Sequence, residues 1–555
     1  MRSRITAMAA AAAGTLCFAA VALAQEDPHA ACTSMSWVPQ EILERPVALH
    51  SGTGNALDVA TTSSAEALAL YRQGLNYLHG YVWIESTRSF NEALRKDPKL
   101  ALAYWGLSRA YSGLDDQKAA ESAAKQAQAL SANASPREQR RIALRLQQLE
   151  AIANLADTAR HAAYKQAIDK ALAADFDDVE LWLIRGNAEE PTAAGRGQRG
   201  AVASTAFYMQ ALRLAPDNAA AHHYLTHSYE GIGQVDRALE HGEAYAGLAP
   251  TIPHAHHMWG HDLRRVGRID EAIAAFQRTD ALENAYYVQE KIPSDLDWHH
   301  VHNLDLLATS HEHKGQMRTA EALLRQAADF PAPTEYQEFN QKSLAVFLLG
   351  RQRWREALAA TRRLTDAKAG GTRVVGHALA GHAHLGMHAV EPARAALASA
   401  QRELEAVPVL APGISVNRAA VVPYVDALRA EILLRDGKGE EGEILLKDVQ
   451  SRLRALPGPD AWTQALFRLE AFARTARDVG NWNLAEYTAR QMLEHDAAYG
   501  GSHLALALVA RQRGDTELAR TEAAAARNFW RDADRGMKEL RELRTLEADR
   551  RVSRR

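Results

Sequence analysis

The chain has 555 residues, a formal charge of −3 and an aromatic content of only 7%. Acidic and basic residues are interspersed, so the sequence offers no basic surface for nucleic acid, and we expect no nucleic-acid partner. Ala and Leu are abundant while alternating β-branched runs are scarce, which predicts an all-α fold. The sequence contains no Gly-x-Ser-x-Gly elbow, P-loop or dinucleotide fingerprint, so no motif decides whether the chain is an enzyme.

Residues 1–24 have the pattern of a secretory signal peptide. Arg2 and Arg4 precede an apolar, alanine-rich run, which ends in a small-x-small cleavage site at Ala24. We therefore expect export to the periplasm of a bacterium, or secretion; a membrane anchor is disfavoured because the apolar run is short. No later segment has 18 apolar residues in a row, so the mature chain should lack a transmembrane segment. Cys32 is then its only cysteine, and no internal disulfide can form.

A repeat begins after an irregular, proline-containing lead-in at residues 25–64. Within residues 67–100, five residues stand at steps 8, 11, 24, 27 and 32 of a 34-residue unit, namely Gly74, Tyr77, Phe90, Ala93 and Pro98. This spacing resembles that of the tetratricopeptide repeat (TPR) superfamily. The resemblance implies a TPR-type α-solenoid, a right-handed superhelix of helix–turn–helix units whose first helices line a concave inner wall.

The pattern predicts three further segments. Residues 65–330 form an N-terminal array, residues 331–533 form a second TPR-like array, and residues 534–555 form a charged C-terminal helix and tail. Within the second array, units are expected to begin near Glu338, Thr372, Pro423, Leu466 and Gly500. Breaks are expected near Pro412 and Pro457, because proline interrupts a helix.

Histidines concentrate on the predicted inner wall. Thirteen of the 23 histidines lie between residues 222 and 313, which is less than a fifth of the chain. Two successive units place a His-x-x-x-His pair at steps 5 and 9 of their first helices, and His254 and His302 stand at step 2 of their own units. An i, i+4 pair lets two imidazoles share one metal ion. The candidate metal ligands are His223, His227, His254, His257, His261 and His302.

Other polar residues are expected around this wall. Asp305, Glu312 and His313 stand at inner-face steps of the next unit, as second-shell partners or a general base. Trp105 is a further inner-wall candidate. His222 and His256 stand at a packing step, and the remaining histidines of the stretch are interpreted as solvated or as helix-B side chains, namely His241, His299, His300 and His311.

A narrower resemblance supports a functional site here. Residues 223–227, 257–261 and 265–268 are similar to a subgroup of exported bacterial TPR proteins with a His-Met-Pro-x-His helix and an Arg-Val-Gly-Arg turn. This chain departs from the subgroup at Trp259, where a proline is expected. The resemblance names no chemistry.

Two functions remain open from the sequence. The first is an exported scaffold that binds a peptide or protein partner in its concave groove, as extended repeat surfaces do. The alternative is a metal-binding or metal-dependent enzymatic protein that uses the histidines. Imidazole-rich, thiol-free ligation suits zinc, copper or iron.

Overall fold

The computed structural model describes residues 38–154, 156–189, 202–332, 335–408, 418–456 and 459–548. The predicted signal peptide, Cys32, Pro412, Pro457 and the basic tail after residue 548 lie outside these residues. Every regular element within them is helical. None of their helices is long and apolar enough to cross a membrane.

The first half of the array contains helices α1 to α15. Their bounds are α1 (Gln40–Leu43), α2 (Ala65–His79), α3 (Trp83–Lys96), α4 (Ala101–Gly113), α5 (Gln117–Leu130), α6 (Pro136–Ala153), α7 (Thr158–Ala174), α8 (Val179–Asn187), α9 (Val202–Leu214), α10 (Ala219–Gly231), α11 (Val235–Leu248), α12 (Pro253–Arg265), α13 (Ile269–Glu290), α14 (Trp298–His313) and α15 (Met317–Asp329).

The second half contains helices α16 to α27. Their bounds are α16 (Glu335–Asn340), α17 (Lys342–Gly350), α18 (Trp354–Thr365), α19 (Gly370–Gly386), α20 (Val390–Ala406), α21 (Arg418–Arg435), α22 (Gly439–Ala455), α23 (Pro459–Asp478), α24 (Trp482–His495), α25 (Gly500–Arg513), α26 (Thr516–Phe529) and α27 (Lys538–Ala548).

Consecutive helices pack as pairs, and pairs repeat at the predicted interval. α10 begins at Ala219 and α12 begins at Pro253, 34 residues later. Each pair needs a small residue where its helices cross. A Cβ at Gly74 would lie 2.6 Å from the ring of Phe90, and a Cβ at Gly260 would lie 2.8 Å from that of Phe276. The prediction of an all-α, TPR-type solenoid is confirmed.

Two unit boundaries differ from the predicted ones. Pro423, expected to open a unit, lies inside α21, which begins at Arg418. Leu466 likewise lies within α23, which begins at Pro459. Pro423 is buried and falls in the second turn of α21, where it removes one backbone donor.

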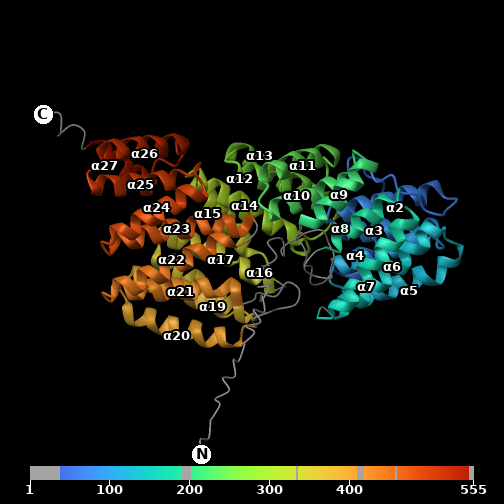
Figure 1. Ribbon diagram of the computed structural model, residues 1–555, viewed down its shortest axis with the longest axis horizontal. Coiled ribbons are helices and arrows are strands. Elements are labelled where there is room, and N and C mark those ends of the chain that lie inside the picture. Colours follow the sequence, from blue (N-terminus) through green and yellow to red (C-terminus); the bar gives the residue numbers. More distant parts are fainter. Residues whose placement is uncertain are drawn as a thin grey trace, which may run out of the picture.

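The array curls twice. Figure 1 shows α2–α9 on one side, α19–α27 on the other, and α12, α14 and α16 between them. In the first half the α2–α3 pair returns to the later units, since Trp83 stacks on Trp298 with ring centroids 5.7 Å apart. In the second half the end of the chain reaches the middle, because Asp534 N–H donates to the carbonyl of Gly315 at 3.0 Å. Trp530 Nε1 also donates to the carbonyl of His313 at 3.1 Å.

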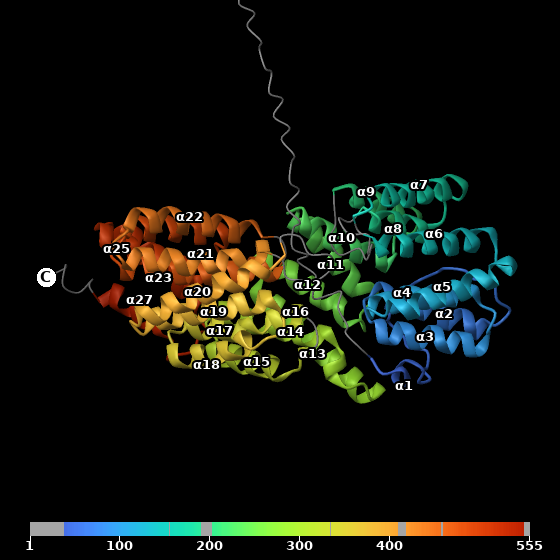
Figure 2. The ribbon, with the colours of Figure 1, turned by 90° about the horizontal axis from the view of Figure 1, so that it is seen from below.

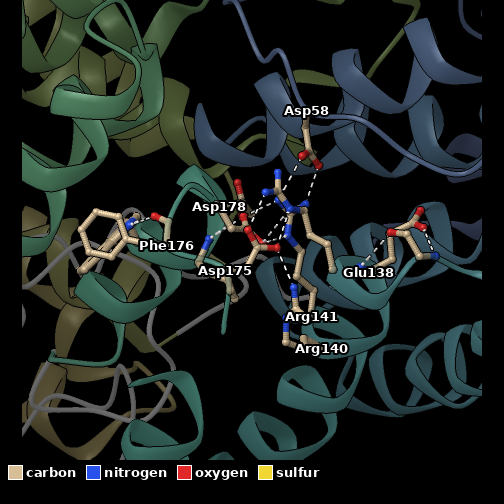
Figure 3. Close-up of polar contacts among 12 residues, drawn as sticks. Asp58, Glu138, Arg140, Arg141, Asp175, Phe176 and Asp178 are labelled. Atoms are coloured by element: carbon tan, nitrogen blue, oxygen red, sulfur yellow. Dashed lines mark hydrogen bonds and ion pairs between the residues drawn. The ribbon is translucent and has the colours of Figure 1, made fainter. Parts of the chain in front are cut away.

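The lead-in is ordered by contacts with the array. Gln73 on α2 donates to the carbonyl of Ala48 and accepts from His50 N–H, at 3.0 and 2.6 Å. Asp58 accepts two hydrogen bonds from the buried Arg141, at 2.6 and 3.0 Å. Figure 3 shows this guanidinium between Asp58 and Asp178, which comes from the turn before α8. Residues 46–62 therefore run along α2 and tie it to α6 and α8.

Candidate metal centre

The six predicted ligands lie on three neighbouring first helices. α10 contributes His223 and His227, α12 contributes His254, His257 and His261, and α14 contributes His302. α10 contacts α12 and α12 contacts α14. All six side chains are buried, with exposed fractions between 0 and 6%. A site assembled here is enclosed by protein.

The first triplet joins α10 to the start of α12. His223 Nε2 lies 2.9 Å from His227 Nε2 and 3.1 Å from His254 Nε2. One nitrogen from each of the three rings lies within 4.8 Å of the others. Two nitrogens of a tetrahedral site with bonds of about 2.0 Å are about 3.3 Å apart, so small movements of the rings would fit one ion.

The second triplet joins α12 to α14. His257 Nε2 and His261 Nε2 are 2.8 Å apart. The ring of His302 lies 4.7 Å from that of His257 and 6.0 Å from that of His261, measured between centroids. Its ligand nitrogen falls within the same 4.8 Å limit. The chain thus contains two adjacent groups of three imidazoles.

The six predicted ligands form two groups of three in the structure and do not converge on one position. His254 groups with His223 and His227 of α10, and not with His257 and His261 of its own helix. Side chains on a helix lean toward its N-terminus, so His254 in the first turn reaches back to α10. His257 and His261, further along α12, meet His302 on α14.

Hydrogen bonds behind the rings assign the tautomers of two ligands. His223 Nδ1 lies 2.6 Å from the carbonyl oxygen of His79, which can only accept, so Nδ1 carries the proton. His257 Nδ1 lies 3.0 Å from Asn303 Oδ1, and the Asn303 amide donates to the carbonyl of Phe276. Both rings therefore direct an Nε2 lone pair toward their triplets, which is the orientation that a metal ligand requires.

A chain of contacts stands behind His254. Its Nδ1 lies 3.1 Å from His299 Nε2, and His299 Nδ1 contacts Glu283. Burial and the neighbouring imidazoles His223 and His299 hold the pKa of His254 well below its usual value, which keeps that ring neutral. Its Nε2 faces His223 Nε2 at 3.1 Å.

Two buried carboxylates lie beside the second triplet. Glu230 Oε2 is 3.8 Å from His261 Nδ1, and Asp262 follows His261 on α12. Burial raises the pKa of Glu230 to about 7, against the opposing effect of Arg265. Burial and then the charge of Glu230 raise the pKa of Asp262. Carboxylates behind ligating imidazoles commonly orient them.

The α2–α3 turn covers the first triplet. Tyr81 adopts a left-handed backbone with φ of 58°, and its ring centroid lies 4.5, 5.9 and 5.0 Å from those of His223, His227 and His254. The residue two positions after the first helix has the same left-handed backbone in other units, as at Asp115 and Gly233, so this φ belongs to the turn of the repeat. Because this turn closes over the inner wall, the imidazoles are sealed from the groove that the sequence predicts they line.

The other predicted site residues lie away from the triplets. Burial raises the pKa of Asp305, against the opposing charges of Lys342 and Arg264. Glu312 faces Arg351, and His313 Nε2 lies 3.0 Å from Asp496, so both turn toward the second half of the array. Trp105 is buried in the core of the N-terminal half, with the guanidinium of Arg109 4.7 Å from its ring centroid.

Sequence reasoning did not identify the residues behind the ligands. His299, His300 and His311 are buried, so the expectation that they are solvated is wrong. His79, Tyr81, Glu283 and Asn303 carried no signal from the repeat, because they act through contacts between units. The unusual run of histidines at 299, 300 and 302 could have indicated that this turn is internal.

A third group that could hold an ion is better explained as an ion pair. It comprises Asp280, Glu283 and His300. His300 Nδ1 lies 2.9 Å from Glu283 Oε2. Burial lowers the pKa of His300, but the hydrogen bond and charge of Glu283 outweigh burial and raise it above its usual value. A protonated imidazole cannot ligate through that nitrogen.

Comparisons with known proteins describe the architecture only. No protein-family model matches the chain, and no curated protein matches it. Yeast Tom70 is 13% identical, with 88% of this chain and 96% of Tom70 covered at a TM-score of 0.33. A TPR protein from Parabacteroides merdae is 14% identical, with 48% and 93% covered at 0.34. YrrB, a TPR protein described as having an unusual peptide-binding site, is 15% identical, with 36% and 93% covered at 0.26.

The fold and the histidines together define a class. The chain is an α-solenoid of TPR-type helix pairs. Two buried imidazole triplets lie between the first helices of three successive units, α10, α12 and α14. The identities and TM-scores of these matches are too low to assign a function to this chain.

Proposed function

We propose that this protein binds transition-metal ions, one in each histidine triplet. The observation that carries the proposal is the convergence of three buried imidazole nitrogens in each triplet, with His223 Nε2 2.9 Å from His227 Nε2 and 3.1 Å from His254 Nε2. The carbonyl of His79 behind His223 leaves its Nε2 as an acceptor that a cation can use. Thiol-free imidazole ligands suit zinc, copper or iron.

Three imidazoles leave a fourth position for water or a small molecule, as catalytic zinc sites do. The first triplet therefore has the donor set for metal-assisted chemistry. The residues predicted as general bases, Asp305 and Glu312, lie away from it, whereas Glu283 and His299 stand behind His254. Those two residues would hold His254 in position.

Metal content measures the proposal directly. Protein purified from its native compartment should contain about two metal ions per chain, and His223→Ala/His227→Ala and His257→Ala/His261→Ala should each lose about one. The matched control is His222→Ala/His256→Ala, which removes partly exposed histidines on α10 and α12 whose Nε2 atoms contact the carbonyls of Pro216 and Pro250, ahead of those helices. Less than about 0.2 metal per chain in the parent protein would contradict the proposal.

Peptide or protein binding is the second candidate. A cavity of about 480 Å³ lies between the lead-in, α2, α8 and α10, and its lining combines carboxylates such as Asp177 and Asp217 with the amide and guanidinium groups of Asn76, Asn218 and Arg137. Such groups recognise extended backbone and carboxylates. A partner held there should be lost from an Asn218→Ala/Arg137→Ala variant without a change in metal content. Retention of the partner by this variant would reject the site.

The proposal places the protein outside the bacterial cytoplasm, on the pattern of residues 1–24. N-terminal sequencing of the mature protein tests this, with a start near Gln25 expected.

A further inference from the structure

A second cavity, of about 410 Å³, lies next to the first triplet. Its walls come from the lead-in, the α2–α3 turn, the start of α12, the end of α13 and the start of α14. The end of α13 also lies beside the lead-in in Figure 2, where Arg45 donates to the carbonyl of Glu290 at 2.9 Å. This volume falls in the usual range for sites that bind small molecules.

Aromatic side chains form much of the wall. They come from four separate segments of the chain and are Tyr77, Tyr81, Tyr286 and Trp298. The hydroxyl groups of two of them are hydrogen-bonded. Tyr77 Oη lies 2.7 Å from His50 Nδ1, and Tyr286 Oη lies 3.1 Å from Glu85. Tyr81 and Trp298 are each 4% exposed and pack on other rings, so each presents only part of its ring to the cavity.

The charged groups of the wall are carboxylates. Glu283, Glu290 and Asp297 line the cavity, and its described lining residues include no lysine or arginine. Arg88 stands behind the wall, where Nη1 donates to Glu290 at 2.9 Å and also pairs with Glu85. One guanidinium is thus shared by two carboxylates.

The three lining carboxylates outnumber the two cations behind them, which are Arg88 and the protonated His300 at 2.9 Å from Glu283. Asp297 accepts from the hydroxyl of Tyr287 at 2.7 Å, a neutral donor. Burial and then the charge of Glu283 raise the pKa of Asp297. Burial likewise raises the pKa of Glu85 to about 7, although Arg88 opposes it. An anion would meet repulsion here, and a cation would be attracted.

We propose that this cavity binds a small organic cation with a substituted ammonium group. Aromatic faces attract weakly hydrated ammonium groups through cation–π interactions, and carboxylates add direct attraction. Methyl or larger substituents on the nitrogen fit aromatic walls better than the tight water shell of an inorganic cation does. This site is separate from the proposed metal ligands except at His254, and it needs no metal.

The test compares choline with 3,3-dimethyl-1-butanol, its neutral carbon analogue, by calorimetry on the full mature chain. Chelator is present throughout, so failure of the metal proposal leaves the result unaffected. Choline should bind at least about tenfold more tightly than the analogue, which corresponds to the strength of a desolvated cation–π contact. Equal binding of the two compounds, or no choline binding at millimolar concentration, would overturn the proposal.

Variants on α13 separate the cavity from the fold. Ala285 and Ala281 are both exposed on this helix, and Ala285 lines the cavity whereas Ala281 does not appear in its lining. Ala285→Arg places a cation at the cavity and should abolish choline binding, while Ala281→Arg should bind like the parent. Trp298→Leu should weaken binding about tenfold. Unchanged choline binding in Ala285→Arg, with the parent's melting temperature, would also reject the site.

Discussion

His223 Nε2 and His254 Nε2 lie 3.1 Å apart, and a backbone carbonyl and the Glu283–His299 contact stand behind their rings. The two helices that carry them begin 34 residues apart, so the contact is a product of the repeat. The contact brings two ring nitrogens within the range of one shared ion in a buried site. The stability of the protein should therefore respond to metal.

Metal should raise the melting temperature. A ligand that binds only the folded state at about 100 times its dissociation constant stabilises it by about 2.7 kcal/mol. Thermal unfolding with zinc, and then with excess chelator, measures this difference. The control His222→Ala/His256→Ala should respond as the parent does, whereas a chain lacking both His-x-x-x-His pairs should not respond. An identical response of that chain would assign the effect to other sites.

The raised pKa of Glu312 predicts that the stability of the folded protein depends on pH. Burial, against the effect of Arg351 and with that of Glu470, raises its pKa to about 8. Because the folded pKa exceeds the unfolded value of about 4.3, this group's stabilising contribution is complete below that value and declines as pH rises toward 8. Glu312→Gln should remove this decline and be more stable than the parent by about 1–3 kcal/mol at pH 8.5.

Urea unfolding at pH 5 and pH 8.5 checks the result for Glu312. Glu440 is exposed on α22, so Glu440→Gln should leave the parent's pH profile unchanged. A parent profile that is retained by Glu312→Gln would show that another group causes the dependence.

The contact between Asp58 and Arg141 should hold the lead-in in place. Removing one partner of a buried pair costs about 3–5 kcal/mol, and Asp178 remains to pair with Arg141, so Asp58→Asn should cost less, about 1–3 kcal/mol. Limited proteolysis should cut residues 46–62 faster in this variant. Asp448→Asn, on the exposed side of α22, is the control, and equal cutting rates in the two variants would argue against the anchor.

Substituting alanine at Gly74 and at Gly247 should change the stability of the protein in opposite directions, because only Gly74 lies at a close helix crossing. A Cβ at Gly74 would lie 2.6 Å from the Phe90 ring, so Gly74→Ala should destabilise by about 1–3 kcal/mol. At Gly247 on α11 no heavy atom lies within 4 Å, so Gly247→Ala should stabilise by up to about 1 kcal/mol. Denaturant midpoints compare them, and stabilisation by both substitutions would contradict the crossing.

The helix pairs could be predicted because their signal is local. Gly74 and Phe90 meet inside one unit, and their spacing records that contact in the sequence. The histidines were predictable for the same reason, since His223 and His227 stand one helical turn apart.

The enclosure of the site was not predictable from spacing. Tyr81 covers the first triplet because curvature accumulated over several units brings α2 and α3 back to α10, α12 and α14. A small rotation at each unit sets this return, and no single residue pattern specifies it. The position of His254 with α10 depends on side-chain direction in the first turn of α12, which periodicity also leaves open.

The hydrogen bonds that join Trp530 to His313 and Asp534 to Gly315 change how the second half should come apart. In an open array, terminal units fray first and the rest persist with nearest-neighbour stability. Here the end of the chain packs on the unit that begins at α14. Deleting it should therefore expose the backbone of α14, which lies more than two hundred residues earlier in the sequence. Melting of residues 298–548 should be a single cooperative event, and hydrogen exchange at α14 should accelerate when residues 530–548, which include both contacts, are removed.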